Sequence, residues 1–314
     1  MPSARVRVRL LAAAAVALVA AASAGCGLGA GPAPAETQLL VTQDFGSRGV
    51  VQTDHPKAGG SDTVMRLLER NAPKVTTRFG GGFVQSIDGV SGGRRGGRPV
   101  DWFFYVNGIQ AEKGATSVRV HQGDRVWWDH HDWSVTDRVP AVVGSFPEPF
   151  LHGIDGRRLP TRVECVDPSA DACNTVLAKL NDMGLPAAKG GIGNSFTQDT
   201  LRVLVGPWRA LRADHTAVLL EKGPASSGVF ARPATDGKSI ALLGPTGKTT
   251  RTLGAGTGLV AATAVLGNDP VWLVTGTDDA AVGAAASAFD EGALAGRFAV
   301  AMSNGKPVAL PEVP

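Results

Sequence analysis

The residues with the greatest chemical potential are two adjacent histidines flanked by aspartates, in the stretch Asp-His-His-Asp-Trp at positions 129–133. Imidazole nitrogens and carboxylate oxygens are common ligands of divalent metals. Neighbouring side chains of a strand point to opposite faces, however, so His130 and His131 would not converge on one ion unless the segment turns. We therefore predict no metal site. An exposed strand end and a ligand-contacting segment remain as the two interpretations.

Three glycine-containing segments approach known functional loops without matching them. A phosphate-binding loop would need glycine where Leu242 stands, and residues 244–250 lie between two strand-like stretches, which favours a hairpin turn. Residues 254–258 lack the full spacing of a dinucleotide-binding loop, and Ser195 is not in a nucleophile-elbow pattern. No catalytic combination of serine or cysteine with histidine is apparent from the spacing, nor a pair of carboxylates. We predict a protein that is not an enzyme and has no cofactor.

The beginning of the chain is typical of a secretory signal. Three arginines between positions 5 and 9 precede an apolar run over 10–24, so residues 1–25 are predicted to be a signal peptide. The Ser-Ala-Gly-Cys that follows resembles the lipobox of bacterial lipoproteins, although Ser23 stands where leucine is usual. Acyl chains on Cys26 would hold the protein on the extracytoplasmic face of the cell membrane. Ordinary secretion with cleavage nearby is the alternative.

The other two cysteines, Cys165 and Cys173, are predicted to form a disulfide, because the compartment is oxidising and their spacing matches no zinc pattern. Without residues 1–25 the chain carries 28 basic and 28 acidic residues, so it is nearly neutral. A nucleic-acid partner would need a concentrated basic face, and we predict none. The basic stretch 92–98 is short and glycine-rich, which indicates a solvated loop.

Aromatic residues are rare and concentrated. Only 18 of 314 residues are aromatic, yet seven of them fall between Trp102 and Trp133. On a strand, Trp102 and Phe104 would face one side and Phe103 and Tyr105 the other, so both faces carry rings. The pattern fits a core plus a domain interface, or a surface that stacks on a flat ligand or partner. The candidate contact residues are Trp102, Tyr105, Trp127, Trp128, His130, His131 and Trp133.

Periodicity predicts an α+β protein of two domains that follow a tether at 26–37. The first domain, 38–145, has strands at 38–46, 82–90 and 100–108, two short strands within 117–129, and a helix at 61–72 capped by Ser61 or Asp62. Asn107 and Gly108 supply a hairpin turn. Residues 146–160, with three prolines, form a linker. In the second domain, 161–314, alternating strands and helices predict an α/β domain with a largely parallel sheet.

The motifs of residues 38–135 resemble the transcobalamin-like C-terminal domain family (domain of unknown function 4430). Its pattern is a Ser-Ile-Asp-Gly turn (86–89), an aromatic strand ending in Val-Asn-Gly (106–108), Gly114, and Gly-Asp (123–124) before Trp127. The resemblance implies a β-grasp-like fold for the first domain. It implies nothing for residues 161–314.

The family resemblance also implies a function. In vertebrate cobalamin carriers this kind of domain closes over a corrin ring that is held on an α/α-barrel. This chain would then be a binding lipoprotein that captures cobalamin or a related corrinoid, together with a separate α/α-barrel protein and an importer. The alternative is an adhesion or scaffolding lipoprotein that binds a protein or glycan through its aromatic surface.

Overall fold

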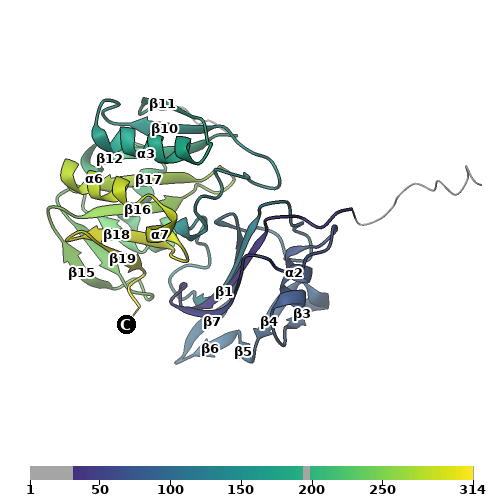
Figure 1. The fold of residues 1–314 in the computed structure, drawn as a ribbon. Helices are drawn as coiled ribbons and strands as arrows, with labels where there is room; N and C mark the ends of the chain where they lie inside the picture. The colour runs from purple at the N-terminus through teal and green to yellow at the C-terminus, as the bar shows by residue number, and fades with distance from the viewer. Residues whose placement is uncertain (1–30, 194–198, 314) are drawn as a thin grey trace, which may run out of the picture.

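The computed structural model describes residues 31–193 and 199–313, which fold into two halves, each built on its own β-sheet (Figure 1). Helices and strands occur in both halves, which confirms the α+β class. The predicted signal peptide (1–25), Cys26 and Ser195 lie outside the described residues. Within the described part of the chain, no helix combines the length and apolar character needed to cross a bilayer.

The N-terminal half is built on a mixed sheet in the order β2-β1-β9-β7-β6, with β8 paired to β7. Its central strands β1 and β9 are parallel, and the other pairs are antiparallel. The strands are β1 (Gln38–Gln43), β2 (Arg48–Thr53), β6 (Gly93–Arg95), β7 (Arg98–Val106), β8 (Ile109–Gln110) and β9 (Arg125–Asp132). A smaller sheet contains β3 (Thr76–Arg78), β4 (Phe83–Ile87) and β5 (Val90–Ser91), with the 3-10 turn η1 (Phe79–Gly81) between β3 and β4.

Helix α2 (Val64–Asn71) covers one face of the main sheet. Val64, Leu67 and Leu68 recur at helical spacing and are completely buried against that face. Thr63 caps the helix, because its hydroxyl accepts a hydrogen bond from the Arg66 amide at 3.4 Å. The predicted caps, Ser61 and Asp62, were therefore wrong.

The turn chemistry of this half was predicted better than its strands. Asn107 and Gly108 both adopt positive φ, +53° and +77°, which confirms the hairpin between β7 and β8. The expected strand before Gly123 does not form, since Arg119 makes only an isolated bridge to Thr63. Strand β2 was missed because its residues are all exposed or half-buried, which leaves no hydrophobic alternation to detect.

The C-terminal half is built on a seven-stranded sheet in the order β11-β10-β12-β17-β16-β18-β19. Only the first three pairings in this order are parallel. The prediction of a largely parallel sheet was therefore wrong, because strands β16 to β19 pair antiparallel. Its strands are β10 (Thr161–Cys165), β11 (Ala187–Gly191), β12 (Leu201–Pro207), β16 (Gly258–Thr263), β17 (Val271–Gly276), β18 (Ala299–Ser303) and β19 (Lys306–Leu310).

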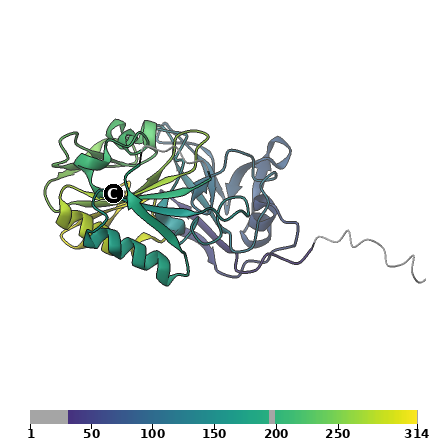
Figure 2. The same ribbon diagram turned by 90° about the horizontal axis from the view of Figure 1, so that it is seen from above.

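Two layers cover this sheet (Figure 2). Helices α3 (Asp171–Asp182) and α6 (Asp279–Ser287) pack on one face. The other face is covered by a layer that includes a small hairpin sheet. The remaining elements are η2 (Val143–Ser145), α4 (Trp208–Leu211), η3 (Ala217–Lys222), α5 (Pro224–Ser227), β13 (Ala231–Pro233), β14 (Ile240–Leu243), β15 (Thr249–Leu253) and α7 (Glu291–Leu294). Residues 244–248 form the predicted hairpin turn, and residues 254–257 lead into strand β16.

The connection over residues 146–160 is packed into the C-terminal half. Phe146 and Phe150 are 2% and 0% exposed and contact the rings of Trp272 and Phe289. The segment contains no named helix or strand, as its prolines predict, but it contributes to the core. The predicted disulfide is present between Cys165 and Cys173, where it joins the end of β10 to the first turn of α3.

Candidate functional site

The aromatic strands present two different buried faces. Strand register places Trp102 opposite His130 and Phe104 opposite Trp128, all on the side of α2. The rings of Phe104 and Trp128 are stacked at 4.8 Å between centroids, and Trp102 lies 5.1 Å from the ring of His130. Together with the apolar side of α2, these side chains form the core of the N-terminal half.

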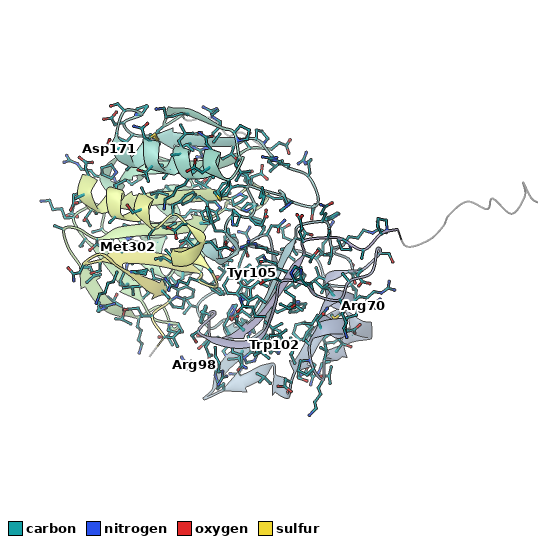
Figure 3. All side chains as sticks on the ribbon, in the orientation of Figure 1. Arg70, Arg98, Trp102, Tyr105, Asp171 and Met302 are labelled. Carbon is teal, nitrogen blue, oxygen red and sulfur yellow. A yellow bond between two sulfur atoms is a disulfide. The ribbon has the colours of Figure 1, made fainter. Side chains whose placement is uncertain are left out.

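The opposite face packs on the C-terminal half. Tyr105, Trp127 and His131 surround the ring of Phe298, with centroid distances of 5.6, 5.1 and 5.5 Å. Phe45 adds a fourth contact to Phe298 at 5.1 Å. Tyr105 accordingly lies at the boundary between the halves, whereas Trp102 lies further inside the N-terminal half (Figure 3).

The predicted contact residues are therefore mostly enclosed. Six of them are between 0% and 5% exposed: Trp102, Tyr105, Trp127, Trp128, His130 and His131. Only Trp133 is partly exposed, and its indole nitrogen donates to Asp101 at 2.9 Å. This burial favours the interpretation as core and domain interface, because a flat ligand could stack on these rings only if they were uncovered. Residues 129–132 are the buried end of β9, which corrects the expected exposed strand end.

A polar network lies inside the interface around Asp129. Its carboxylate accepts hydrogen bonds from the Thr42 hydroxyl (2.5 Å), the Phe45 and Gly46 amides (3.0 and 2.9 Å), and Nδ1 of His131 (2.8 Å). The indole of Trp127 donates to Thr42 at 2.7 Å. Burial alone would raise the pKa of Asp129, but the hydrogen bonds and charge of its partners outweigh burial and lower it.

This network contains residue types that catalytic sites use, but its imidazole is buried. The ring of His131 is stacked between Phe45 and Phe103, at 4.6 Å from each, and is 2% exposed. Tyr105, whose pKa is raised by burial and then by the charge of Asp129, has no hydrogen-bond partner for its hydroxyl. Since the imidazole is buried between aromatic rings, the network is suited to fixing the interface. Across the described residues, no group of three or more histidine, cysteine or acidic side chains could hold a metal.

A cleft of about 960 Å³ opens beside this interface. Strands β1 and β2 line one side, and β19 with the chain around α7 lines the other. The buried side chains of Thr42, Phe45 and Trp127 contribute to the lining, so the polar network lies directly behind it. The residues that contribute from the C-terminal half are Glu291, Ala295, Gly296, Arg297, Val308, Ala309, Pro311, Glu312 and Val313.

Charged groups in the cleft are largely paired. Arg125 joins the halves, because its guanidinium lies 2.6 Å from the carboxylate of Glu291 and donates to the carbonyl of Phe146 at 2.5 Å. Glu312 pairs with Arg251.

The backbones of the two halves also meet at Gly46, which has a φ of +83°. Any side chain there would collide with the carbonyl oxygen of Gly296. Glycine is therefore required at this contact between the halves.

Sequence patterns gave no signal for this cleft except at Trp127. Its walls come from segments more than 200 residues apart, and most of its lining side chains belong to ordinary strands and turns.

The motif residues of the N-terminal half have structural roles instead. Asn107 donates to Asp124 at 2.9 Å and to the carbonyl of Gly153 at 2.8 Å, and Asp124 accepts from the amide of His121 at 2.7 Å. Burial is the main cause that raises the pKa of Asp124.

Comparison with known proteins identifies one region. The family model of a domain of unknown function (DUF4430) matches residues 61–132, which run from just before α2 to the end of β9. This match confirms the predicted relation to domain of unknown function 4430 over these residues. No curated protein and no solved structure matches the chain.

Proposed function

We propose that this chain is a surface-anchored extracytoplasmic binding lipoprotein, without enzymatic activity, whose ligand occupies the cleft between the halves. The cleft carries the proposal. Its volume of about 960 Å³ is at the upper end of the roughly 300–1,000 Å³ typical of small-molecule sites. Its lining mixes apolar side chains with paired charges, which suits binding of a large ligand with both polar and apolar parts.

Cobalamin or a related corrinoid is the ligand that the family resemblance supports. The order of the N-terminal sheet is consistent with a β-grasp-like domain, since its first and last long strands are parallel neighbours and α2 packs on one face. No α/α-barrel occurs among residues 31–193 and 199–313. The proposal therefore includes a separate α/α-barrel protein and an importer as partners.

Equilibrium dialysis against cobalamin and cobinamide tests the ligand. The chain from Gly27 onward retains every described residue and is the form to use. We expect saturable binding in the micromolar range or tighter. Ala309→Trp, at an exposed position of β19 that lines the cleft, should weaken binding about tenfold or more by filling it. Ala280→Trp, on the exposed side of α6, is the matched control and should bind like the unmodified chain.

Two results would contradict the corrinoid proposal. One is the absence of saturable binding both alone and with a candidate barrel protein, and the other is equal binding by the two tryptophan variants. A chain that binds no corrinoid but still captures a surface protein or glycan would instead support the adhesion or scaffolding alternative.

The anchor has its own test. Cys26→Ser in the full-length chain should move the protein from the membrane fraction to the soluble extracytoplasmic fraction, because the acylated thiol is lost. An unmodified chain that is already soluble would exclude the anchor while leaving the ligand proposal intact.

A further inference from the structure

Two phenylalanines lie exposed in the N-terminal half, outside both the cleft and the core. Phe79 is 87% exposed and Phe83 is 36% exposed. Their rings contact edge to face, with 6.3 Å between centroids. The three residues between them are all glycine, so the rings stand at the end of the β3–β4 hairpin without neighbouring side chains to cover them.

The backbone holds this arrangement in an unusual conformation. Phe79 has a φ of +52°, and Gly80 and Gly81 follow at +68° and +93°. A bulky residue rarely adopts positive φ, because its Cβ crowds the backbone. Such outliers motivate a functional hypothesis when the fold gives no other reason for them. Here the conformation exposes Phe79, and no core contact compensates for it.

Basic side chains flank the two rings. Arg78 immediately precedes Phe79 and is exposed. The carbonyl oxygen of Gly82 lies 3.2 Å from the position that a Cβ atom on Gly114 would occupy. The loop that contains the exposed Lys113 therefore lies next to the hairpin. Glu112 of the same loop lies 4.0 Å from Arg138, so its charge is partly compensated. Exposed aromatic rings with nearby arginine and lysine are typical of segments that insert into the surface of an anionic bilayer.

The position of the hairpin matches this chemistry. Strands β3 and β4 lie at the end of the molecule away from the C-terminal half, on the side where the described chain begins (Figures 1 and 2). Eleven residues lie between Cys26 and the start of β1, and a fully extended chain of that length spans about 40 Å. An anchor at Cys26 would thus keep this end of the molecule close to the bilayer.

We propose that the Phe79–Phe83 hairpin is a membrane-docking tip that inserts its two rings into the surface of an anionic bilayer. This orientation rests on the proposed lipid anchor. Docking would fix the N-terminal half on the membrane and direct the C-terminal half away from it.

Vesicle flotation of the chain from Gly27 onward tests the tip without the lipid. We expect the unmodified chain to float with vesicles of phosphatidylcholine and phosphatidylglycerol, and to bind less when phosphatidylglycerol is omitted or salt is raised. The double variant Phe79→Ser, Phe83→Ser should lose about tenfold or more of this partitioning. Leu266→Ser removes a 70% exposed apolar side chain from the C-terminal half and should change nothing.

Equal flotation of the unmodified chain and the double variant would overturn the proposal. So would an unmodified chain that does not float at all, a result that would leave a protein partner as the occupant of the tip. Because the tested chain carries no acyl group and no ligand, these outcomes are independent of the membrane fractionation of Cys26→Ser and of the corrinoid dialysis.

Discussion

The central strands of the N-terminal sheet bury side chains on both faces, but the two faces differ in what covers them. The α2 face is closed by residues of its own half, such as Leu67 and Leu68, and its contacts are mainly apolar. The other face is closed by the C-terminal half, and its contacts combine aromatic rings around Phe298 with the hydrogen bonds of Asp129. One face therefore makes a domain, whereas the other joins two halves into one unit.

This difference explains why so many of the scarce aromatic residues lie on two neighbouring strands. A small domain needs one apolar face, and an exposed second face of rings would be a liability. Here the interface covers the second face, and the proposed ligand site is the cleft beside it. Aromatic enrichment on its own thus does not distinguish a binding surface from an intramolecular interface.

The largest effect should come from emptying the interface. Phe298→Ala removes the ring that Phe45, Tyr105 and Trp127 share, and should lower the free energy of unfolding by about 4 kcal/mol. If the halves unfold as one unit, calorimetry should show one transition in the unmodified chain and two in this variant. Trp128→Ala, on the α2 face, is the matched core truncation and should destabilise the protein without separating the transitions. Separated transitions in Trp128→Ala alone would reverse the assignment of the two faces.

Replacing the buried carboxylate should have the next largest effect. Asp129→Asn keeps the shape but weakens the hydrogen bonds from Thr42, His131 and the amide of Gly46, and we expect a loss of about 3 kcal/mol near neutral pH. Urea denaturation gives the value. Asp101→Asn, which changes a partly exposed carboxylate of β7, is the control and should cost much less. Equal losses would mean that the Asp129 network contributes nothing special.

The same carboxylate predicts a pH dependence. Because the pKa of Asp129 is lower in the folded than in the unfolded chain, the unfolded state binds more protons as the solution is acidified. Its contribution to stability should be complete above the ordinary aspartate pKa of about 3.9 and lost as pH falls toward the folded value. Asp129→Asn should therefore flatten the acid side of a plot of unfolding free energy against pH. An unchanged slope would contradict this.

The disulfide should have a smaller effect and shows how tightly the halves are coupled. The double variant Cys165→Ser, Cys173→Ser reopens a short loop in the C-terminal half, away from the two faces of the N-terminal sheet. It should lower the free energy of unfolding by about 2–3 kcal/mol. If the interface couples the halves, fluorescence of the N-terminal tryptophans should report the same lowered midpoint as the C-terminal half. A midpoint that shifts only for the C-terminal half would show that they unfold separately.

The smallest effect is expected at the ion pair across the interface. Glu291 is well exposed, so the pair with Arg125 should contribute less than about 1 kcal/mol and weaken at high salt. A double-mutant cycle of Arg125→Met and Glu291→Gln isolates this coupling from the hydrogen bond of Arg125 to Phe146. A coupling of several kcal/mol would place the main attachment of the halves here instead of at Phe298.

Local patterns were sufficient for much of the fold. The helix at α2 follows from apolar spacing, and the hairpin at Asn107–Gly108 follows from residues that tolerate positive φ. The disulfide was predicted from two cysteines whose spacing matches no zinc pattern. Strand β2 and the antiparallel part of the C-terminal sheet could not be predicted in this way, because partners distant in the chain create them.

By itself, the sequence determined the α+β class, the relation to DUF4430, the two-sided aromatic strands and the pairing of Cys165 with Cys173. These depend on residue type and spacing along short segments. Only the tertiary structure decided that the second aromatic face is an interface, that Asp129 and His131 are enclosed, and where the cleft lies. Burial and access depend on which distant segment covers a side chain, and local periodicity carries no information about that partner.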